Sequence, residues 1–206
     1  ILIWTNLTAN PFPGFFEMQN GQTALAAAAR GAASAAGAVI VQSNFVGSAD
    51  SLWYLVPTDG GYFRLMNVNS ALALAVQNAS SANGAAIVQS PYAGDGSADW
   101  LPATNTGGYY FFTNRLSGKV LSVLTSSTSP NTQLNQWTPD GGAHQKWRLI
   151  PYGNVVSNSV VIPPLAAALT NENEIRVQLS GVPGARYVVE TATNLISPKW
   201  SPACRS

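Results

Sequence analysis

The stretch that decides the fold is residues 101–147, LPATNTGGYYFFTNRLSGKVLSVLTSSTSPNTQLNQWTPDGGAHQKW. It is 47 residues long, it ends on Trp147, and the residue before it is Trp100. A third tryptophan, Trp53, precedes Trp100 by the same 47 positions. Further sets share this spacing: Gln42, Gln89 and Gln136; Asn20, Asn67 and Asn114; Met18, Leu65 and Phe112; Ile40, Ile87 and Leu134. Because no gap is needed between residues 14 and 153, the sequence predicts three tandem copies of one structural unit.

Short apolar runs alternate with turns inside each copy. In the third copy the pattern predicts strands over 109–114, 120–123, 133–137 and 145–150, separated by polar loops. Four short strands in 47 residues are typical of an all-β barrel or sandwich. Three such copies also predict closure around a pseudo-threefold axis, which removes exposed sheet edges.

One segment of the first copy conflicts with this pattern. Residues 24–38 contain ten alanines in fifteen positions, which propensity alone assigns to a helix. The repeat instead aligns residues 27–29 with 74–76 and 121–123, both of which have the pattern of strands. We follow the repeat and expect a strand, because tertiary context overrides propensity.

The tripeptide Gln145-Lys146-Trp147, with Asn135-Gln136-Trp137 ten residues earlier, resembles the Q-x-W signature of ricin-B-type β-trefoil lectins and carbohydrate-binding modules. The resemblance covers residues 14–153. It implies an all-β, β-trefoil fold of twelve strands, six in a barrel and six in three hairpins that cap one end. Ser51 and Ala98 replace the first glutamine of the signature in the other two copies.

The recurring tryptophans and glutamines are expected to be structural. Large rings that recur once per copy fill barrel interiors, so Trp53, Trp100 and Trp147 are predicted to be core residues. A buried amide must satisfy its donors and acceptors, and pairing with the backbone of loops would do so. The set Gln42, Gln89 and Gln136 is therefore also expected to be structural.

The third copy has the best candidate sugar site. The resemblance implies an acidic residue in the second strand, an aromatic at the end of the third, and an Asn-Gln pair before the signature tryptophan. These positions hold Ser122, Trp137, His144 and Gln145, with Asn135 beside them. An aromatic face can cover the C–H face of a pyranose while polar groups bind its hydroxyls. Ser122 departs from the pattern, because a hydroxyl binds more weakly than a carboxylate.

The other two copies lack the acid, the aromatic platform and the glutamine. Phe45 and Tyr92 correspond to each other in the repeat, two positions beyond the platform. They either stack against a sugar or anchor their loops. Asp50 is the polar candidate of the first copy. We rank the third copy first, the second next and the first last, and the sequence does not name the sugar.

Two other functions compete with a carbohydrate-binding module. A glycoside-active enzyme needs two carboxylates roughly 5–10 Å apart, for which Asp50, Asp95 and Asp99 are candidates. Aspartates are also common in turns for reasons of backbone capping. His144 is the single histidine and no nucleophile elbow surrounds a serine, which argues against a catalytic triad. The second competing function is that of a structural spacer whose sugar sites have decayed.

Composition limits the partners. Ten Lys and Arg against nine Asp and Glu leave a net charge of +1, so no basic face for nucleic acid is expected. The sequence contains no run of roughly 18 apolar residues, so membrane insertion is not expected. No cluster of histidines and carboxylates has metal-ligand spacing, and no cofactor is expected. Few charges (9%) with many small polar residues resemble an exported bacterial protein, so we expect secretion.

The chain outside the repeat suggests further modules. Pro163-Pro164 and the alanines after it have the character of a linker, and two strand-like runs, 174–180 and 185–191, surround a Pro-Gly turn. This part resembles the opening half of immunoglobulin- or fibronectin-like modules, and residues 3–7 are expected to pack against it or to belong to a tandem array. We therefore expect tethering to other domains of a longer chain. The predicted divisions are an N-terminal segment 1–13, a β-trefoil 14–153, a linker 154–170 and a partial β-sandwich 171–206.

Overall fold

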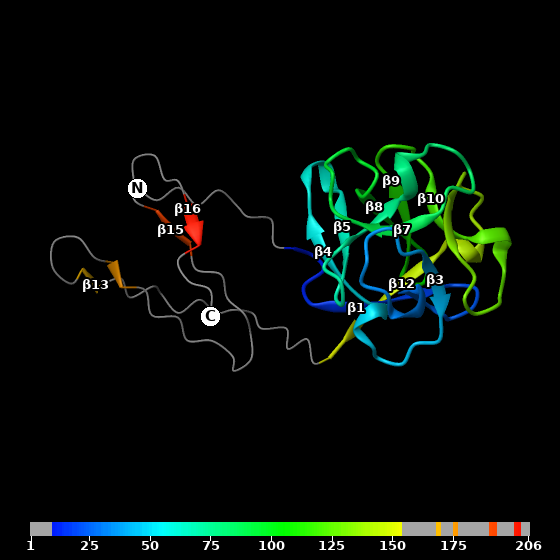
Figure 1. Cartoon of the computed structure of the whole chain (residues 1–206), viewed down its shortest axis with the longest axis horizontal. Helices are drawn as coiled ribbons and strands as arrows, with labels where there is room; N and C mark the ends of the chain where they lie inside the picture. Colours follow the sequence, from blue (N-terminus) through cyan, green and yellow to red (C-terminus); the bar gives the residue numbers. More distant parts are fainter. Residues whose placement is uncertain (1–9, 154–167, 170–174, 177–189, 193–199, 203–206) are drawn as a thin grey trace. The chain divides into compact units, whose positions relative to one another are not determined.

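The computed structural model describes residues 10–153, 168–169, 175–176, 190–192 and 200–202. The chain divides into two compact units, Ile1–Ser157 and Asn158–Ser206, and each is described by itself. In the first unit, twelve strands belong to one sheet (Figure 1). No helix longer than a single 3-10 turn occurs in the described part of either unit.

Six of the strands close into a barrel. Each pairs antiparallel with the next in the ring β1, β4, β5, β8, β9, β12 and back to β1. Closure leaves none of these six with an open edge. The barrel strands are β1 (Phe15–Asn20), β4 (Leu52–Pro57), β5 (Phe63–Asn67), β8 (Trp100–Asn105), β9 (Tyr109–Asn114) and β12 (Trp147–Tyr152).

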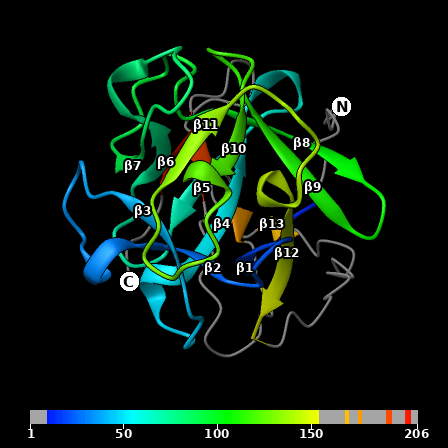
Figure 2. The same cartoon turned by 90° about the vertical axis from the view of Figure 1, so that its right-hand side faces the viewer.

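The other six strands form three hairpins, which isolated bridges join to one another (Figure 2). Each lobe therefore has four strands: β1–β4 in the first lobe, β5–β8 in the second and β9–β12 in the third. This is the β-trefoil that the sequence predicted. The hairpins are β2 (Ala26–Ala29) with β3 (Ile40–Ser43), β6 (Ala73–Val76) with β7 (Ile87–Ser90), and β10 (Val120–Val123) with β11 (Leu134–Trp137).

The alanine-rich segment of the first lobe follows the pattern of the repeat. Residues Ala26–Ala29 are strand β2, paired in register with Ile40–Ser43. The helix that propensity alone suggested does not form, because β2 is held between β1 and β3.

Short 3-10 turns follow or precede several of the strands. They are η1 (Arg30–Ala32), η2 (Ala49–Ser51), η3 (Asp59–Gly61), η4 (Gln77–Ala79), η5 (Leu124–Ser126) and η6 (Ala143–Gln145).

The three signature tryptophans are core residues, as predicted. Trp53, Trp100 and Trp147 have no exposed surface. Each indole N–H donates to a backbone oxygen 26 residues earlier, in the second strand of its own lobe. The N–O distances are 2.8 Å for the first two and 3.1 Å for the third. The one polar group of each ring is thereby satisfied inside the barrel.

Phe12 closes the barrel at the centre of the three lobes. Its ring lies edge-on to three aromatic rings, Phe16, Phe63 and Tyr110, at centroid distances of 6.4, 5.2 and 5.6 Å. These three residues occupy the same position of the 47-residue repeat. A single residue from outside the repeat therefore contacts one aromatic ring of each lobe.

The second unit contributes two short pairs. Strand β13 (Ala168–Leu169) pairs with β14 (Ile175–Arg176), and β15 (Glu190–Ala192) pairs with β16 (Trp200–Pro202). Strand β14 lies within the run predicted over 174–180, and β15 overlaps the end of the run predicted over 185–191. The predicted Pro-Gly turn and the expected packing of residues 3–7 fall outside the described residues.

Candidate functional site

The third-lobe candidate site is built around Trp137, the last residue of β11. Its side chain is 42% exposed, whereas the tryptophans of the core are fully buried. The neighbouring second-lobe loop supports it, since Gly84 lies beside the indole and Thr138 donates two hydrogen bonds to the side-chain oxygen of Asn83. The indole is therefore held on the surface by a fixed backbone.

Asn135 and Ser122 lie on neighbouring strands next to this ring. They are directly paired across β10 and β11, two residues before Trp137 on its own strand. Both are buried, and the carbonyl oxygen of the Asn135 side chain has no hydrogen-bond partner within residues 10–153. A buried acceptor without a donor is uncommon and costs stability. The structure thus brings three of the predicted residues together.

Gln145 and His144 differ in their burial and in their contacts. Gln145 is fully buried; its amide donates to the Thr138 backbone oxygen, and its carbonyl accepts from the Asp140 backbone N–H. These bonds shape the loop, so Gln145 is a supporting residue. His144 keeps 14% of its side-chain surface and lies 3.3 Å from the carboxylate of Asp140.

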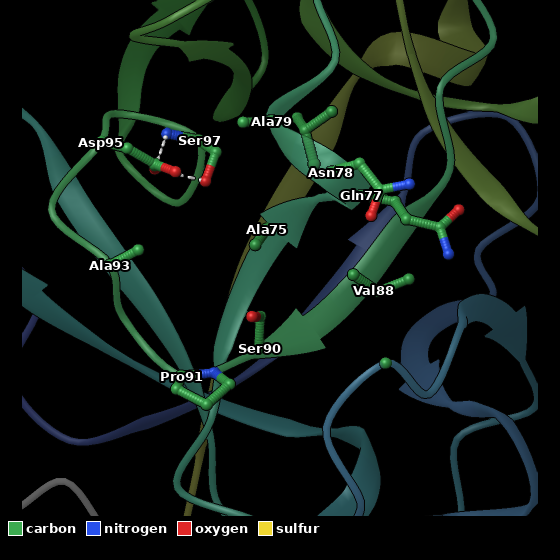
Figure 3. Close-up of a pocket in the computed structure, with 12 residues that line it drawn as sticks. Ala75, Gln77, Asn78, Ala79, Val88, Ser90, Pro91, Ala93, Asp95 and Ser97 are labelled. Atoms are coloured by element: carbon green, nitrogen blue, oxygen red, sulfur yellow. Dashed lines mark hydrogen bonds between the residues drawn. The ribbon is translucent and has the colours of Figure 1, made fainter.

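A hollow of about 310 Å³ occupies the equivalent place in the second lobe (Figure 3). Ala75, Val88 and Ser90 line it, at the repeat positions of Ser122, Asn135 and Trp137. Small side chains at these three positions leave space where the third lobe has an indole and an amide. We call this the second-lobe hollow.

Asp95 supplies the charge at the edge of the second-lobe hollow (Figure 3). One of its carboxylate oxygens accepts hydrogen bonds from the backbone N–H of Ser97 (2.9 Å) and from its hydroxyl (2.6 Å). The Ser97 hydroxyl, more than the backbone bond, lowers the pKa of Asp95 below its ordinary value. The sequence left Asp95 either as a hydrolytic carboxylate or as an aspartate that caps the backbone of a turn, and its two bonds to Ser97 are those of a capping residue.

The remaining candidates lie elsewhere. Tyr92 has its hydroxyl 3.4 Å from Asp99 and is covered by the Arg64 guanidinium, 4.5 Å above the ring. Phe45 packs edge-on against Tyr152 at 5.6 Å, which is the loop-anchoring role that the sequence left open. Asp50 lies in η2, where its backbone oxygen accepts from the Asn67 amide. The structure gathers neither Phe45 nor Asp50 with Trp137, Asn135 and Ser122 of the third-lobe candidate site.

Among the described residues, no group of three or more His, Cys, Asp or Glu side chains could hold a metal ion. None of the helices in the described part of the chain is long and apolar enough to cross a membrane.

The architecture is that of a β-trefoil protein: a closed six-stranded barrel, three hairpins, and a buried tryptophan every 47 residues. The family model for the ricin-type β-trefoil lectin domain-like proteins matches residues 4–90 and 97–166. The chain belongs to this family. Among curated proteins, none matches the chain.

Solved structures show the same architecture. The designed threefold-symmetric protein ThreeFoil is 32% identical, covers 68% of this chain and 99% of its own, and superposes with a TM-score of 0.66. The exo-β-1,3-galactanase 1,3Gal43A from Clostridium thermocellum is 30% identical, with a TM-score of 0.67. That match covers 69% of this chain but only 31% of the galactanase. An agglutinin from Rhizoctonia solani is 19% identical over 68% of this chain and 95% of its own, with a TM-score of 0.61, and shares the fold.

Proposed function

We propose that the trefoil is a non-catalytic carbohydrate-binding module that recognises a poly- or oligosaccharide through shallow sites on its lobes. The observation that carries this proposal is the exposed indole of Trp137, which the second-lobe loop at Asn83 and Gly84 holds on the surface. A saccharide offers an apolar C–H face to such a ring, while its hydroxyls bind polar groups around the ring. The family supports the proposal, since lectins in it bind carbohydrate.

The remaining parts of the proposal concern context. The galactanase match involves about a third of that enzyme, which supports a module attached to other domains. We propose that this trefoil is likewise tethered within a longer, exported protein. A shallow site is expected to bind with affinity on the order of millimolar to micromolar, and attachment to other domains would raise the effective concentration.

The test is a binding screen over soluble glycans and insoluble polysaccharides, with β-1,3-galactan and lactose among the probes. Isothermal titration and polysaccharide pull-down would compare the wild type with Trp137→Ala. Phe15→Ala is the matched control, because Phe15 is an aromatic residue of similar exposure (47%, against 42% for Trp137) on β1 and is not a candidate sugar-binding residue. We expect Trp137→Ala to lose binding at the third lobe by at least tenfold while the control retains it.

Two outcomes would contradict the module. Absence of binding to every probe would indicate a spacer. Release of reducing sugar that disappears in Asp50→Asn, Asp95→Asn or Asp99→Asn would indicate a glycosidase. The lowered pKa of Asp95 already disfavours its use as a general acid, because that role requires a carboxyl group protonated near the working pH.

A further inference from the structure

The chain contains two asparagine–glycine pairs, Asn20-Gly21 and Asn83-Gly84. Asparagine deamidates fastest when glycine follows it, because glycine has no side chain to hinder attack by its own backbone nitrogen. The second pair lies in the loop between β6 and β7, where the second lobe contacts Thr138 of the third lobe. This chemically labile pair is therefore part of the contact between two lobes.

Asn83 is present for its side chain rather than for the turn. Its side-chain oxygen accepts hydrogen bonds from the backbone N–H of Thr138 (3.0 Å) and from the Thr138 hydroxyl (3.1 Å). The corresponding positions of the first and third lobes hold Ala36 and Pro130, so the turn itself does not require asparagine. What this asparagine supplies is the contact with the third lobe.

Gly84 is favoured by the backbone and by its neighbour. Its φ is 82°, a left-handed conformation that glycine adopts without strain. A Cβ atom at this position would lie 3.5 Å from Cζ3 of Trp137, so the indole lies directly against this residue. The two requirements together place an asparagine before a glycine at the support of the exposed ring.

Deamidation of this pair would proceed through a ring. The backbone nitrogen of Gly84 attacks Cγ of Asn83; the new N–Cγ bond forms, the Cγ–Nδ2 bond breaks, and ammonia leaves with the proton that the nitrogen loses. Water then opens the five-membered succinimide. Opening at Cγ gives aspartate, whereas opening at the main-chain carbonyl gives isoaspartate, in which the main chain is longer by one CH₂ group.

The fold restrains both reacting groups. The Gly84 N–H donates a 2.9 Å hydrogen bond to the backbone oxygen of Gln136, and the side-chain oxygen of Asn83 is held by Thr138. Attack therefore requires this loop to separate from the third lobe, which is a local opening. Asn83 is exposed, so the water that opens the ring has access to it.

The pair Asn20-Gly21 is an internal reference. Asn20 is 1% exposed, and its amide donates to the backbone oxygen of His144 at 3.1 Å. The Gly21 N–H donates to the backbone oxygen of Lys146 at 2.7 Å. Because Asn20 is the last residue of β1 and pairs with Trp147 of β12, its release requires the barrel itself to open.

From this arrangement we propose that Asn83 is a modification site, which deamidates when the second and third lobes separate locally. The aspartate product keeps an acceptor for Thr138. The isoaspartate product moves the side chain away from Thr138 and displaces Gly84, so it removes the support of Trp137. Each product adds one negative charge to a chain of net charge +1. This inference needs no bound sugar and does not rest on the proposed function.

The experiment follows the full chain during incubation at mildly alkaline pH, with peptide mapping that separates asparagine, aspartate and isoaspartate. We expect reaction at Asn83 and none at Asn20. Thr138→Val keeps the shape but removes one hydrogen bond, so it is expected to raise the rate at Asn83 by about two- to tenfold. Asn83→Gln is the control without reaction, because its longer side chain would have to close a six-membered ring.

The indole N–H resonance of Trp137, assigned with Trp137→Phe, measures the consequence. The isoaspartate form, isolated by ion exchange, should shift this resonance, whereas Asn83→Asp should leave it in place. Equal rates at Asn20 and Asn83, an unchanged rate in Thr138→Val, or an unshifted resonance in the isoaspartate form would overturn the inference. None of these measurements uses a sugar, so failure of the carbohydrate screen would overturn the proposed function and leave this inference standing.

Discussion

The side-chain amide of Gln136 in the third lobe donates a 2.7 Å hydrogen bond to the backbone oxygen of Ser80 in the second lobe. The same NH₂ group donates to the oxygen of Ala82 at 3.0 Å, and its carbonyl accepts from the Ser117 hydroxyl at 2.6 Å. This confirms the structural role that the sequence predicted for the recurring glutamines.

The bonds of the three glutamines form a closed cycle between lobes. Gln89 of the second lobe reaches the first-lobe loop at Ala33 and Ala35, and Gln42 of the first lobe reaches the third-lobe loop at Ser127 and Ser129. Each lobe thus closes the hairpin loop of the preceding one. Threefold repetition of one bond pattern links all three lobes.

Replacing Gln136 with alanine is expected to destabilise the trefoil by roughly 2–3 kcal/mol. The change removes the three hydrogen bonds of this buried amide, and each intramolecular hydrogen bond contributes a net stability of about 0.5–1.5 kcal/mol. Urea unfolding followed by tryptophan fluorescence would measure the effect. Gln133→Ala is the control, because the Gln133 side chain forms no hydrogen bond within the described residues. Equal effects of the two changes would contradict the interlobe role.

Replacing Phe12 with alanine is expected to cost about 1–3 kcal/mol. The ring is partly buried and contacts one aromatic residue from each lobe, so its loss opens the barrel mouth on all three sides. The change in the midpoint of thermal unfolding would report this. Phe12→Leu should recover part of the stability, and a Phe12→Ala variant with the wild-type midpoint would show that the contact contributes nothing.

Glu17 gives the trefoil a predictable pH dependence. Its side chain is buried on β1, and desolvation raises its pKa above the usual value, partly opposed by a hydrogen bond from Gln19. The folded state therefore binds this proton more tightly than the unfolded state. The contribution of Glu17 to stability falls as pH rises from the unfolded pKa through the raised folded pKa.

Glu17→Gln should therefore raise the free energy of unfolding at pH 7 and have less effect near pH 4. The amide keeps the shape and the acceptor for Gln19 but carries no charge to desolvate. Denaturant titrations of both proteins between pH 4 and pH 8 would show the difference growing with pH. A difference that shrinks with rising pH would contradict the assignment.

A pair of exchanges tests the strained turn that follows the second strand of each lobe. Thr125 in the third lobe has φ of 55°, and its counterpart in the first lobe is Gly31 with φ of 63°. A left-handed conformation costs a non-glycine residue about 1–2 kcal/mol, of which the greater unfolded-state freedom of glycine offsets roughly half. Thr125→Gly is expected to stabilise by about 0.5 kcal/mol, and Gly31→Thr to destabilise by about 1 kcal/mol. If both exchanges shifted the midpoint of thermal unfolding in the same direction, the cost of the left-handed conformation could not explain the effects.

The 47-residue spacing made the fold predictable because it is a property of the chain itself. Side chains that recur at a constant interval must occupy equivalent environments in a closed symmetric structure. The burial of Trp53, Trp100 and Trp147 and the strand at Ala26–Ala29 followed from this, even where helix propensity pointed elsewhere.

The candidate sites were less predictable, because they depend on departures from the repeat. Trp137 could be chosen from the sequence, since an aromatic occurs there in one copy only. Nothing in the spacing indicated that Ala75, Val88 and Ser90 leave a hollow, or that the carboxylate of Asp99 is buried with one of its two oxygens unpaired.

The sequence by itself determined the architecture, the core and the interlobe glutamines, because each is repeated three times and each copy corroborates the others. Only the tertiary structure decided which surface residues meet: Asp59, Asp95, Asp99 and Arg115 come from three separate turns and line one hollow. Contacts between such turns depend on how the closed barrel brings its lobes together, and no interval along the chain records them.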